Sequence, residues 1–228
     1  MPSAAPQVGP IAGSALALEQ ARLEQGGERI VEDEVRDSLL YVAAGAGSVA
    51  IDDTEYELQA RSAALVLAGE RATVRAGEGL SIVVATVGDE ADRHAPMGRR
   101  EVTASLNAGD TEHATGARSF QILFGPHNGS TRATLFAGFI PPGKAPWHFH
   151  LYDEIVWVPD GPGRLHIGDE TEELGPGSAF RLRPRQVHIV ENANADRELT
   201  VIGVFTPAGS PSAAYLTPDV AAEYRFGE

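Results

Sequence analysis

The stretch WHFHLYDE, residues 147–154, is the strongest guide to the expected fold. Successive side chains of an extended strand point to opposite faces, so its two histidines share one face and Glu154 falls on the same parity. A helix would scatter these three side chains around its axis. The turn sequences PPG at 141–143 and PDGPG at 159–163 bound the stretch on both sides, which predicts one β-strand between them.

His148, His150 and Glu154 form a candidate metal site together with His188, which follows a connection rich in glycine and proline. Imidazole nitrogens and a carboxylate oxygen suit a divalent first-row metal such as Mn, Fe, Co, Ni or Zn. A single histidine on a strand is usually only a hydrogen-bonding partner, and a lone glutamate is usually solvated. Three imidazoles and one carboxylate gathered on an inward face would be costly without a cation. We therefore predict one divalent metal per chain.

Two spacings resemble the motifs of the cupin superfamily. The run from Gly143 to Gly161 reads G-x4-H-x-H-x3-E-x6-G and is similar to the first motif, with four residues where five usually precede the first histidine. The run from Gly177 to Asn192 reads G-x10-H-x3-N and is similar to the second, with arginines at 183 and 185 replacing its usual proline and glycine. The resemblance implies a β-barrel, and the four candidate ligands match the metal ligands of the family one by one.

Composition limits the remaining classes. The 228 residues allow one large domain or two small ones, and a hydrophobic content of 43% is ample for a packed core. A net charge of −14 disfavours nucleic acid and anionic membrane as partners, because both are polyanions. The absence of cysteine excludes disulfides and thiolate chemistry. With no signal-peptide pattern and no membrane-spanning run, we expect a soluble, cytoplasmic protein.

An internal repeat relates the two halves of the chain at an offset of 116 residues. Glycines of turns and apolar residues of strand parity are the features that a duplicated β-barrel would retain. The residues that match without a gap are Gly27/Gly143, Val42/Val158, Gly45/Gly161, Gly47/Gly163, Ile51/Ile167, Asp53/Asp169, Leu58/Leu174, Ser62/Ser178 and Ala63/Ala179. We therefore predict an all-β bicupin: two tandem cupin barrels (double-stranded β-helix, or jelly-roll) with few short helices, over residues 1–98 and 99–228.

The first copy has no equivalent of the metal ligands. At the same offset the four ligand positions are occupied by Glu32, Glu34, Ser38 and Ala72. Two carboxylates without a third donor could hold a hard cation, but they are more typical of a solvated strand face. We expect a metal-free N-terminal barrel that contributes packing, dimerisation or one wall of the site.

Several segments carry their own predictions. Residues 15–24 have helix-forming composition, but the repeat aligns them with the strand-like run 131–140, and we favour a strand for part of them. An Asn-Gly step between 119–124 and 131–140 predicts a hairpin. The polar run 88–110 is read as the connection between domains, and 217–224 as a short capped helix. Three histidines in polar or turn segments are expected to be exposed and unligated: His94, His113 and His127.

Candidate catalytic residues flank the metal motif. Tyr152 shares the ligand parity and could place a phenol beside the metal. His166 could be a partner of the ligands or a general base, although a hydrogen-bonded core or rim histidine is the more common case. Arg181 or Arg183, if either points inward, offers a forked cation for a carboxylate or phosphate; if outward, they make that face soluble. Trp147 and Phe149 have the opposite parity and are expected to pack on the outer sheet.

Three functions remain open at this point. The first is a metal-dependent enzyme acting on a small organic substrate, of the dioxygenase, isomerase or decarboxylase type that such ligand sets resemble. The second is a non-catalytic protein that binds or senses a small molecule at the metal. The third is a storage or structural protein whose metal only stabilises the barrel. Exposed sheet faces and edges lead us to expect a homodimer.

Overall fold

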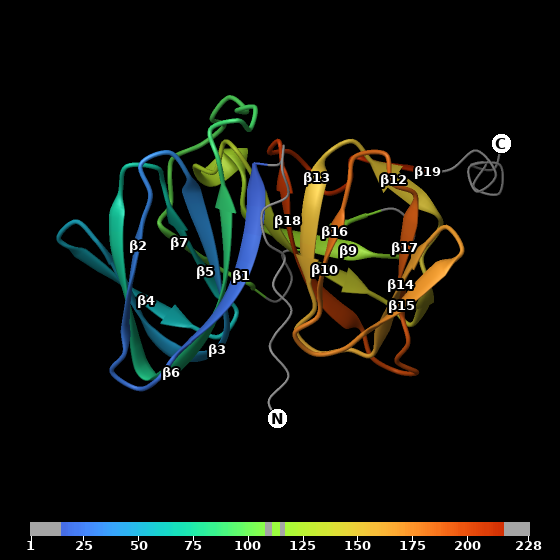
Figure 1. The fold of residues 1–228 in the computed structure, drawn as a ribbon, viewed down its shortest axis with the longest axis horizontal. Helices are drawn as coiled ribbons and strands as arrows, with labels where there is room; N and C mark the ends of the chain where they lie inside the picture. Colours follow the sequence, from blue (N-terminus) through green and yellow to red (C-terminus); the bar gives the residue numbers. More distant parts are fainter. Residues whose placement is uncertain (1–14, 108–110, 115–116, 217–228) are drawn as a thin grey trace.

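The computed structural model describes residues 15–107, 111–114 and 117–216, and it is nearly all β (Figure 1). Two β-barrel units lie side by side, the first built from blue to green segments and the second mainly from yellow to red ones. The all-β prediction is confirmed. The helix expected over 217–224 lies outside the described residues. Within the described ranges, no helix is long and apolar enough to cross a membrane.

The first unit is a single seven-stranded sheet that bends around its own core. Its order is β1-β6-β3-β5-β7, with β2 beside β6 and β4 beside β3. The two longest strands, β3 and β6, pair with each other from Asp37↔Val87 to Ile51↔Ala72. The strands are β1 (Leu16–Leu23), β2 (Glu28–Glu32), β3 (Asp37–Ile51), β4 (Thr54–Gln59), β5 (Ser62–Val66), β6 (Arg71–Val87) and β7 (Thr103–Ser105).

The second unit divides into two six-stranded sheets. One has the order β16-β13-β18-β10-β9-β8, and the other β15-β14-β17-β12-β19 with β11 beside β17. The elements are β8 (Glu112–His113), β9 (Ser119–Phe124), the 3-10 turn η1 (Pro126–Asn128), β10 (Thr134–Ile140), β11 (Gly143–Lys144), β12 (His148–His150), β13 (Asp153–Trp157), β14 (Gly163–Ile167), β15 (Glu170–Leu174), β16 (Ala179–Leu182), β17 (His188–Asn192), β18 (Leu199–Thr206) and β19 (Ala214–Leu216).

Strand pairing bears on two of the segment predictions. The helix-forming run near the N-terminus is strand β1, paired with β6 from Leu16↔Val87 to Leu23↔Leu80. The strand prediction is confirmed, because a full ladder of backbone hydrogen bonds outweighs a weak helix propensity. Strands β9 and β10 form the predicted antiparallel hairpin, but η1 connects them instead of a two-residue turn.

Strand registers of the two units match at the offset of 116 residues. Ser38 pairs with Val66 in the first unit, and Glu154 pairs with Leu182 in the second. Three further residue pairs of the first unit have counterparts in the second at the same offset. Ile51↔Thr54 corresponds to Ile167↔Glu170, Ile51↔Ala72 to Ile167↔His188, and Glu28↔Arg75 to Lys144↔Glu191. Backbone pairing therefore repeats even where the side chains differ.

A continuous apolar core joins the two units. It combines buried residues of β1, β3, β5 and β6 with buried residues of β9, β10, β13 and β18. Within it the rings of Tyr41 and Trp157, which the offset makes equivalent, lie 6.2 Å apart. Leu39 and Ile155 are a second equivalent pair in this core. Side chains on one face of β3 and of β13 therefore pack in the interface between the units. Side chains on the opposite face of each strand point into the interior of its own barrel.

Polar contacts also cross this interface. Arg132, before β10, forms a buried ion pair with Asp37 at 3.2 Å and donates to the carbonyl oxygen of Val35 at 2.6 Å. Strand β7 pairs with β5 of the first unit, although it follows the boundary predicted at 98/99. The connection therefore returns to the first sheet before it enters the second, a step that the polar composition of 88–110 does not reveal.

Candidate metal centre

The WHFHLYDE stretch folds as two strands in different sheets, which corrects the prediction of one continuous strand. His148 and His150 lie on β12, where His148 faces His188 of β17. The chain bends at Leu151 and Tyr152 and then continues as β13 in the other sheet, where Glu154 pairs with Leu182 and Phe205. The predicted ligands therefore approach from both walls of the second barrel.

All four predicted ligands line one cavity of about 80 Å³ inside the second barrel. Tyr152 lines it too, and the remaining wall is mostly apolar. The other lining residues are Ala114, Arg118, Phe120, Phe136, Gly138, Ile140, Val156, Leu182, Val190, Val201, Pro211 and Ala214. Each ligand side chain belongs to a residue that is at most 5% exposed. Such burial keeps bulk water from competing for the donor atoms.

Backbone carbonyl groups orient the three imidazoles. Nδ1 of His148, His150 and His188 lies 2.9, 2.9 and 2.8 Å from the carbonyl oxygens of Pro146, Tyr152 and Gln186. A carbonyl oxygen only accepts, so each Nδ1 carries the proton and donates it. In a neutral imidazole the remaining nitrogen, Nε2, then has a free lone pair. This tautomer is the one that metal-ligating histidines usually adopt.

Two of the imidazoles are held neutral. Burial lowers the pKa of His148 to about 2, and the positive charge of Arg118 contributes. Burial likewise lowers the pKa of His188 to about 4. Their ring centroids lie 4.4 Å apart, and the rings of His150 and His188 lie 5.1 Å apart. A compact group of imidazoles, two of them with strongly depressed basicity, is suited to binding a cation other than a proton.

The side chains of His150 and Glu154 approach each other closely in the cavity. His150 Nε2 lies 2.9 Å from Glu154 Oε2, yet it has no hydrogen bond of acceptable geometry within the described structure. Because Nδ1 of His150 already holds the ring proton, two lone pairs face one another in the neutral state. A cation between them would remove this repulsion. Gly203 leaves room for the carboxylate, since a Cβ there would lie 2.8 Å from Glu154 Oε1.

Arg118 is a cavity residue that sequence analysis missed. Its Nη1 lies 3.2 Å from His148 Nε2, at the lone pair that a metal would use. Among the described residues, no group of three or more His, Cys, Asp or Glu is already arranged to hold a metal ion. The chemistry of the donors fits a divalent metal, but the Arg118–His148 contact must break to admit one. Arg118 has the same parity as Phe120 of β9, which was the one available signal.

Tyr152 is the one catalytic candidate that lines the cavity. Its ring stacks on His150 at 4.0 Å and on Phe205 at 4.0 Å, and its hydroxyl donates to the carbonyl oxygen of Pro211 at 3.4 Å. Burial raises the pKa of Tyr152, and the charge of Glu154 adds to the effect. The side chain therefore remains a neutral phenol that can donate a hydrogen bond beside the ligands.

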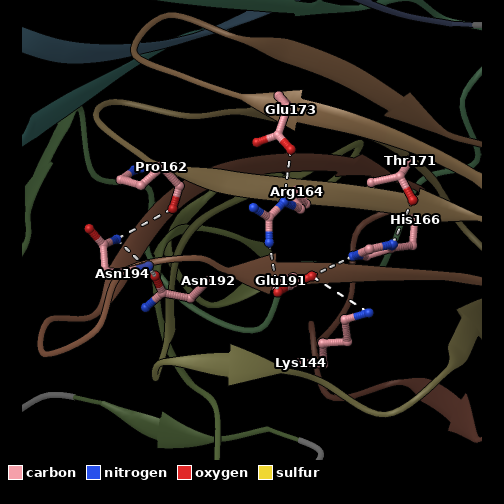
Figure 2. A network of polar contacts seen from close by, with 9 residues as sticks. All are labelled: Lys144, Pro162, Arg164, His166, Thr171, Glu173, Glu191, Asn192 and Asn194. Atoms are coloured by element: carbon pink, nitrogen blue, oxygen red, sulfur yellow. Dashed lines mark hydrogen bonds and ion pairs between the residues drawn. The ribbon is translucent and has the colours of Figure 1, made fainter.

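His166 lies outside the cavity, on the outer face of the sheet. Figure 2 shows it in a network with Glu191, which is joined by Lys144 and Arg164. His166 Nε2 lies 2.6 Å from Glu191 Oε2, and its Nδ1 lies 3.0 Å from Thr171 Oγ1. Strand parity explains the placement, because Ile189, opposite His166, points away from the cavity that His188 lines. We therefore do not retain His166 as a general base.

The two candidate arginines are also outside the cavity. Arg181 makes a two-pronged ion pair with Asp153, with Nε 2.8 Å from Oδ1, and donates to the carbonyl oxygen of Leu16 in the first unit. It therefore serves the interface between the units. Arg183 is exposed, and Leu182 between them lines the cavity instead. The parity of β16 gives the inward position to the apolar residue.

Other predicted placements agree with the structure. His94, His113 and His127 are exposed. Trp147 contacts His166 on the outer face, with ring centroids 6.5 Å apart, and Phe149 stacks on Tyr215 at 5.4 Å. In the first unit, Glu32 and Glu34 are exposed, and Glu32 is paired with Arg71. These two carboxylates thus belong to a solvated strand edge.

A jelly-roll-like β-barrel with histidines and a carboxylate in its interior is typical of cupins. Residues 137–205 match the family model described as a cupin domain. No curated protein sequence gives a significant match. The matched region lies in the second unit and contains the four predicted ligands, so the similarity to a cupin domain is shown for that part of the chain.

Solved structures share the fold at low sequence identity. AerE from Microcystis aeruginosa has a TM-score of 0.70 and 13% identity, over 84% of this chain and 88% of that one. A point mutant of Bacillus subtilis oxalate decarboxylase has a TM-score of 0.71 and 15% identity, over 95% of this chain and 77% of that one. A cupin 2 conserved barrel domain protein from Leptotrichia buccalis has a TM-score of 0.60 and 14% identity, over 84% of both chains.

Proposed function

We propose that the chain is a metal-dependent cupin enzyme in which His148, His150, Glu154 and His188 hold one divalent transition metal. Nε2 of His150 lies 2.9 Å from Glu154 Oε2 and has no hydrogen bond among the described residues, and this observation carries the proposal. The three anchored imidazole tautomers support it. Manganese is one candidate among Mn, Fe, Ni, Co and Zn, since a protein of similar fold, Bacillus subtilis oxalate decarboxylase, is described with Mn(II) centres.

The chain's own residues define what a substrate would meet. A bound divalent metal would supply Lewis-acid or redox chemistry to a small organic molecule beside it. The apolar walls formed by Phe120, Phe136 and Val201 would exclude water. Tyr152 would offer a phenolic hydrogen bond. A dioxygenase-type oxidation is the reaction class that we place first, with isomerase and decarboxylase chemistry as its rivals.

Metal content tests the site directly. We expect the protein from its own host to hold about one metal per chain, measured by elemental analysis. His148→Ala and His188→Ala should each lower that content at least about tenfold, because three remaining donors bind far more weakly. His94→Ala, at an exposed histidine, is the matched control and should leave it unchanged. Unchanged content in the two cavity variants would refute the ligand set.

A second candidate function is non-catalytic binding or sensing of a small molecule at the metal. One observation favours it: among the described lining residues, every carboxylate and imidazole is already a proposed ligand, so no separate general base is in place. Oxygen uptake by iron- or manganese-loaded protein with enols and phenols would support the enzyme. Ligand-induced thermal stabilisation without turnover would support the binder.

We also propose the bicupin organisation, with a metal-free first barrel and a metal-binding second one. The matched registers at the offset of 116 residues support the duplication. A homodimer in the cytoplasm completes the proposal. Light scattering of the purified protein tests the dimer, and fractionation of the host cell tests the location.

A further inference from the structure

Arg181 connects the two barrels next to one of the proposed metal ligands. Its side chain lies on β16, is 7% exposed and makes a two-pronged ion pair with Asp153, the first residue of β13. Its Nη1 also donates to the carbonyl oxygen of Leu16, the first residue of β1, at 3.3 Å. One guanidinium thus joins a strand of each barrel through charge-assisted hydrogen bonds, which are stronger than neutral ones.

The first barrel gives this contact a firm base. Leu16 is fully buried in the core that both units share, and it pairs with Val87. Further along β1, Gln20 Nε2 donates to the carbonyl oxygen of Gly177 in the second unit at 3.0 Å. Strand β1 also packs against β13. Because a densely packed core resists displacement, Leu16 holds a fixed place relative to β13.

Glu154 is fixed differently from the three histidines. Each imidazole donates to a backbone carbonyl oxygen at 2.8 or 2.9 Å. Glu154 is the second residue of its strand and follows the bend at Leu151 and Tyr152. Strand ends open more readily than strand centres. The ion pair with Arg181 holds Asp153 at this end, and alternation along the strand then turns the Glu154 side chain toward the cavity.

We propose that Arg181 is a positioning residue for the metal. By tying Asp153 to the first barrel, it sets where the Glu154 carboxylate meets the imidazoles. The first barrel thereby contributes to metal affinity in the second. This inference rests on the proposed metal site and adds a residue outside the ligand set to it. Residues that orient a metal ligand commonly change metal affinity about 10- to 100-fold when they are replaced.

Zinc affinity of the full-length protein, measured by competition with a chelator, tests this role. Arg181→Met should weaken zinc binding about tenfold, because the start of β13 is released from the first barrel. Asp153→Asn keeps the shape of the side chain, removes its charge and should weaken zinc binding as well. In the double variant zinc should bind no more weakly than in Arg181→Met alone, because both substitutions act through the same contact.

Arg132→Met is the matched control. Arg132 also crosses the interface, and it pairs with Asp37, the equivalent of Asp153 at the offset of 116 residues. Its loss should destabilise the protein more than the loss of Arg181, yet leave zinc affinity within about twofold, because no proposed ligand follows Asp37. If Arg181 were only structural, the loss of zinc affinity would instead follow the loss of stability.

The possible outcomes separate the two proposals. If the native protein binds zinc and both Arg181→Met and Asp153→Asn bind it equally well, the positioning role is refuted and the metal site stands. The role is also refuted if Arg132→Met weakens zinc binding as much as Arg181→Met does. If the native protein binds no zinc, the metal site and the positioning role are both refuted. Circular dichroism verifies that each variant is folded, and Asp153→Asn carries the test if Arg181→Met does not fold.

Discussion

The two barrels share a backbone plan and differ in what fills them. Ile51 faces Ala72 in the first barrel, and the equivalent Ile167 faces His188 in the second. The first interior is a continuous aliphatic core that includes Leu40, Val66 and Val74. At equivalent positions of the second, Val156, Leu182 and Val190 border the cavity. Strand pairing therefore fixes the fold, while the inward side chains remain free to be either core or site.

Continuity of the strands differs as well. Strand β3 runs from Asp37 to Ile51 without a break, whereas its counterpart is divided into β13 and β14 by the turn at 158–162. Strand β6 likewise corresponds to β17 and β18 with a loop between them. The unbroken strands let the first sheet curve around its core as one unit, and the divided strands give the second barrel two separate walls around its cavity.

Exchanging the His188 and Ala72 side chains is the most severe test of this difference. Ala72→His should lower the free energy of unfolding by about 4 kcal/mol, because an imidazole would overpack a fully buried position and lack partners. His188→Ala should change it by less than about 1 kcal/mol in metal-free protein, because the site already borders a cavity. Urea denaturation measures both; equal losses would contradict the distinction between core and site.

Equivalent aspartates make unequal ion pairs, which provides the next test. Asp37 and Arg132 are both at most 5% exposed by side chain, while Asp153 is 16% exposed in its pair with Arg181. Arg132→Met should destabilise by about 3 kcal/mol, since it leaves a buried carboxylate with less compensation. Arg181→Met should lower the free energy of unfolding by about half as much. Urea denaturation measures both free energies of unfolding. A larger loss of stability in Arg181→Met than in Arg132→Met would contradict the expectation that the more buried ion pair contributes more.

A smaller effect separates two equivalent valines. Val74→Ala should lower the free energy of unfolding by about 2 kcal/mol, because it opens a void in a filled core. Val190→Ala should cost about 1 kcal/mol, because it only enlarges an existing cavity. Thermal unfolding of the metal-free proteins compares them. A cost at Val190 that matches that at Val74 would mean that the second barrel is packed as tightly as the first.

The smallest expected effect concerns an ion pair of reversed polarity. Glu28 pairs with Arg75 in the first barrel, and Lys144 with Glu191 at the equivalent position. Burial raises the pKa of Glu191, but the hydrogen bond with His166 and the charges of Lys144 and Arg164 outweigh it and lower the pKa overall. Stability from this group is therefore complete above the ordinary value of 4.5 and is lost as the pH falls below it.

Glu191→Gln should accordingly flatten the fall in thermal stability on the acid side of that value. Glu28→Gln, which removes the carboxylate of the exposed equivalent pair, should leave the pH profile unchanged, because solvent screens that pair. Melting temperatures of the native protein and of both variants, measured from acid to neutral pH, test this difference between the two pairs. Parallel profiles for the native protein and Glu191→Gln would show that the outer network does not contribute to acid stability.

Patterns along the chain were enough to predict the fold class and to select four candidate metal ligands, which the structure brings to one cavity. Turn sequences at 141–143 and 159–163, the repeat at 116 residues and the spacing of two histidines and Glu154 are local or periodic features, so they can be read before any contact is known. They also predicted strand β1 against its helix propensity. Parity also placed Trp147 and Phe149 on the outer side, where they contact His166 and Tyr215.

Which other polar side chains enter the cavity depended on how the strands pack in three dimensions. The bend at Leu151 moves Glu154 to the opposite sheet, and Arg118 arrives from a position 30 residues before His148. His166 and Arg181 had suitable chemistry but the wrong parity, because inward and outward faces of a strand look alike until its neighbours are known. The approach of Arg118 to His148 depends on a contact between distant segments, which no spacing along the chain encodes.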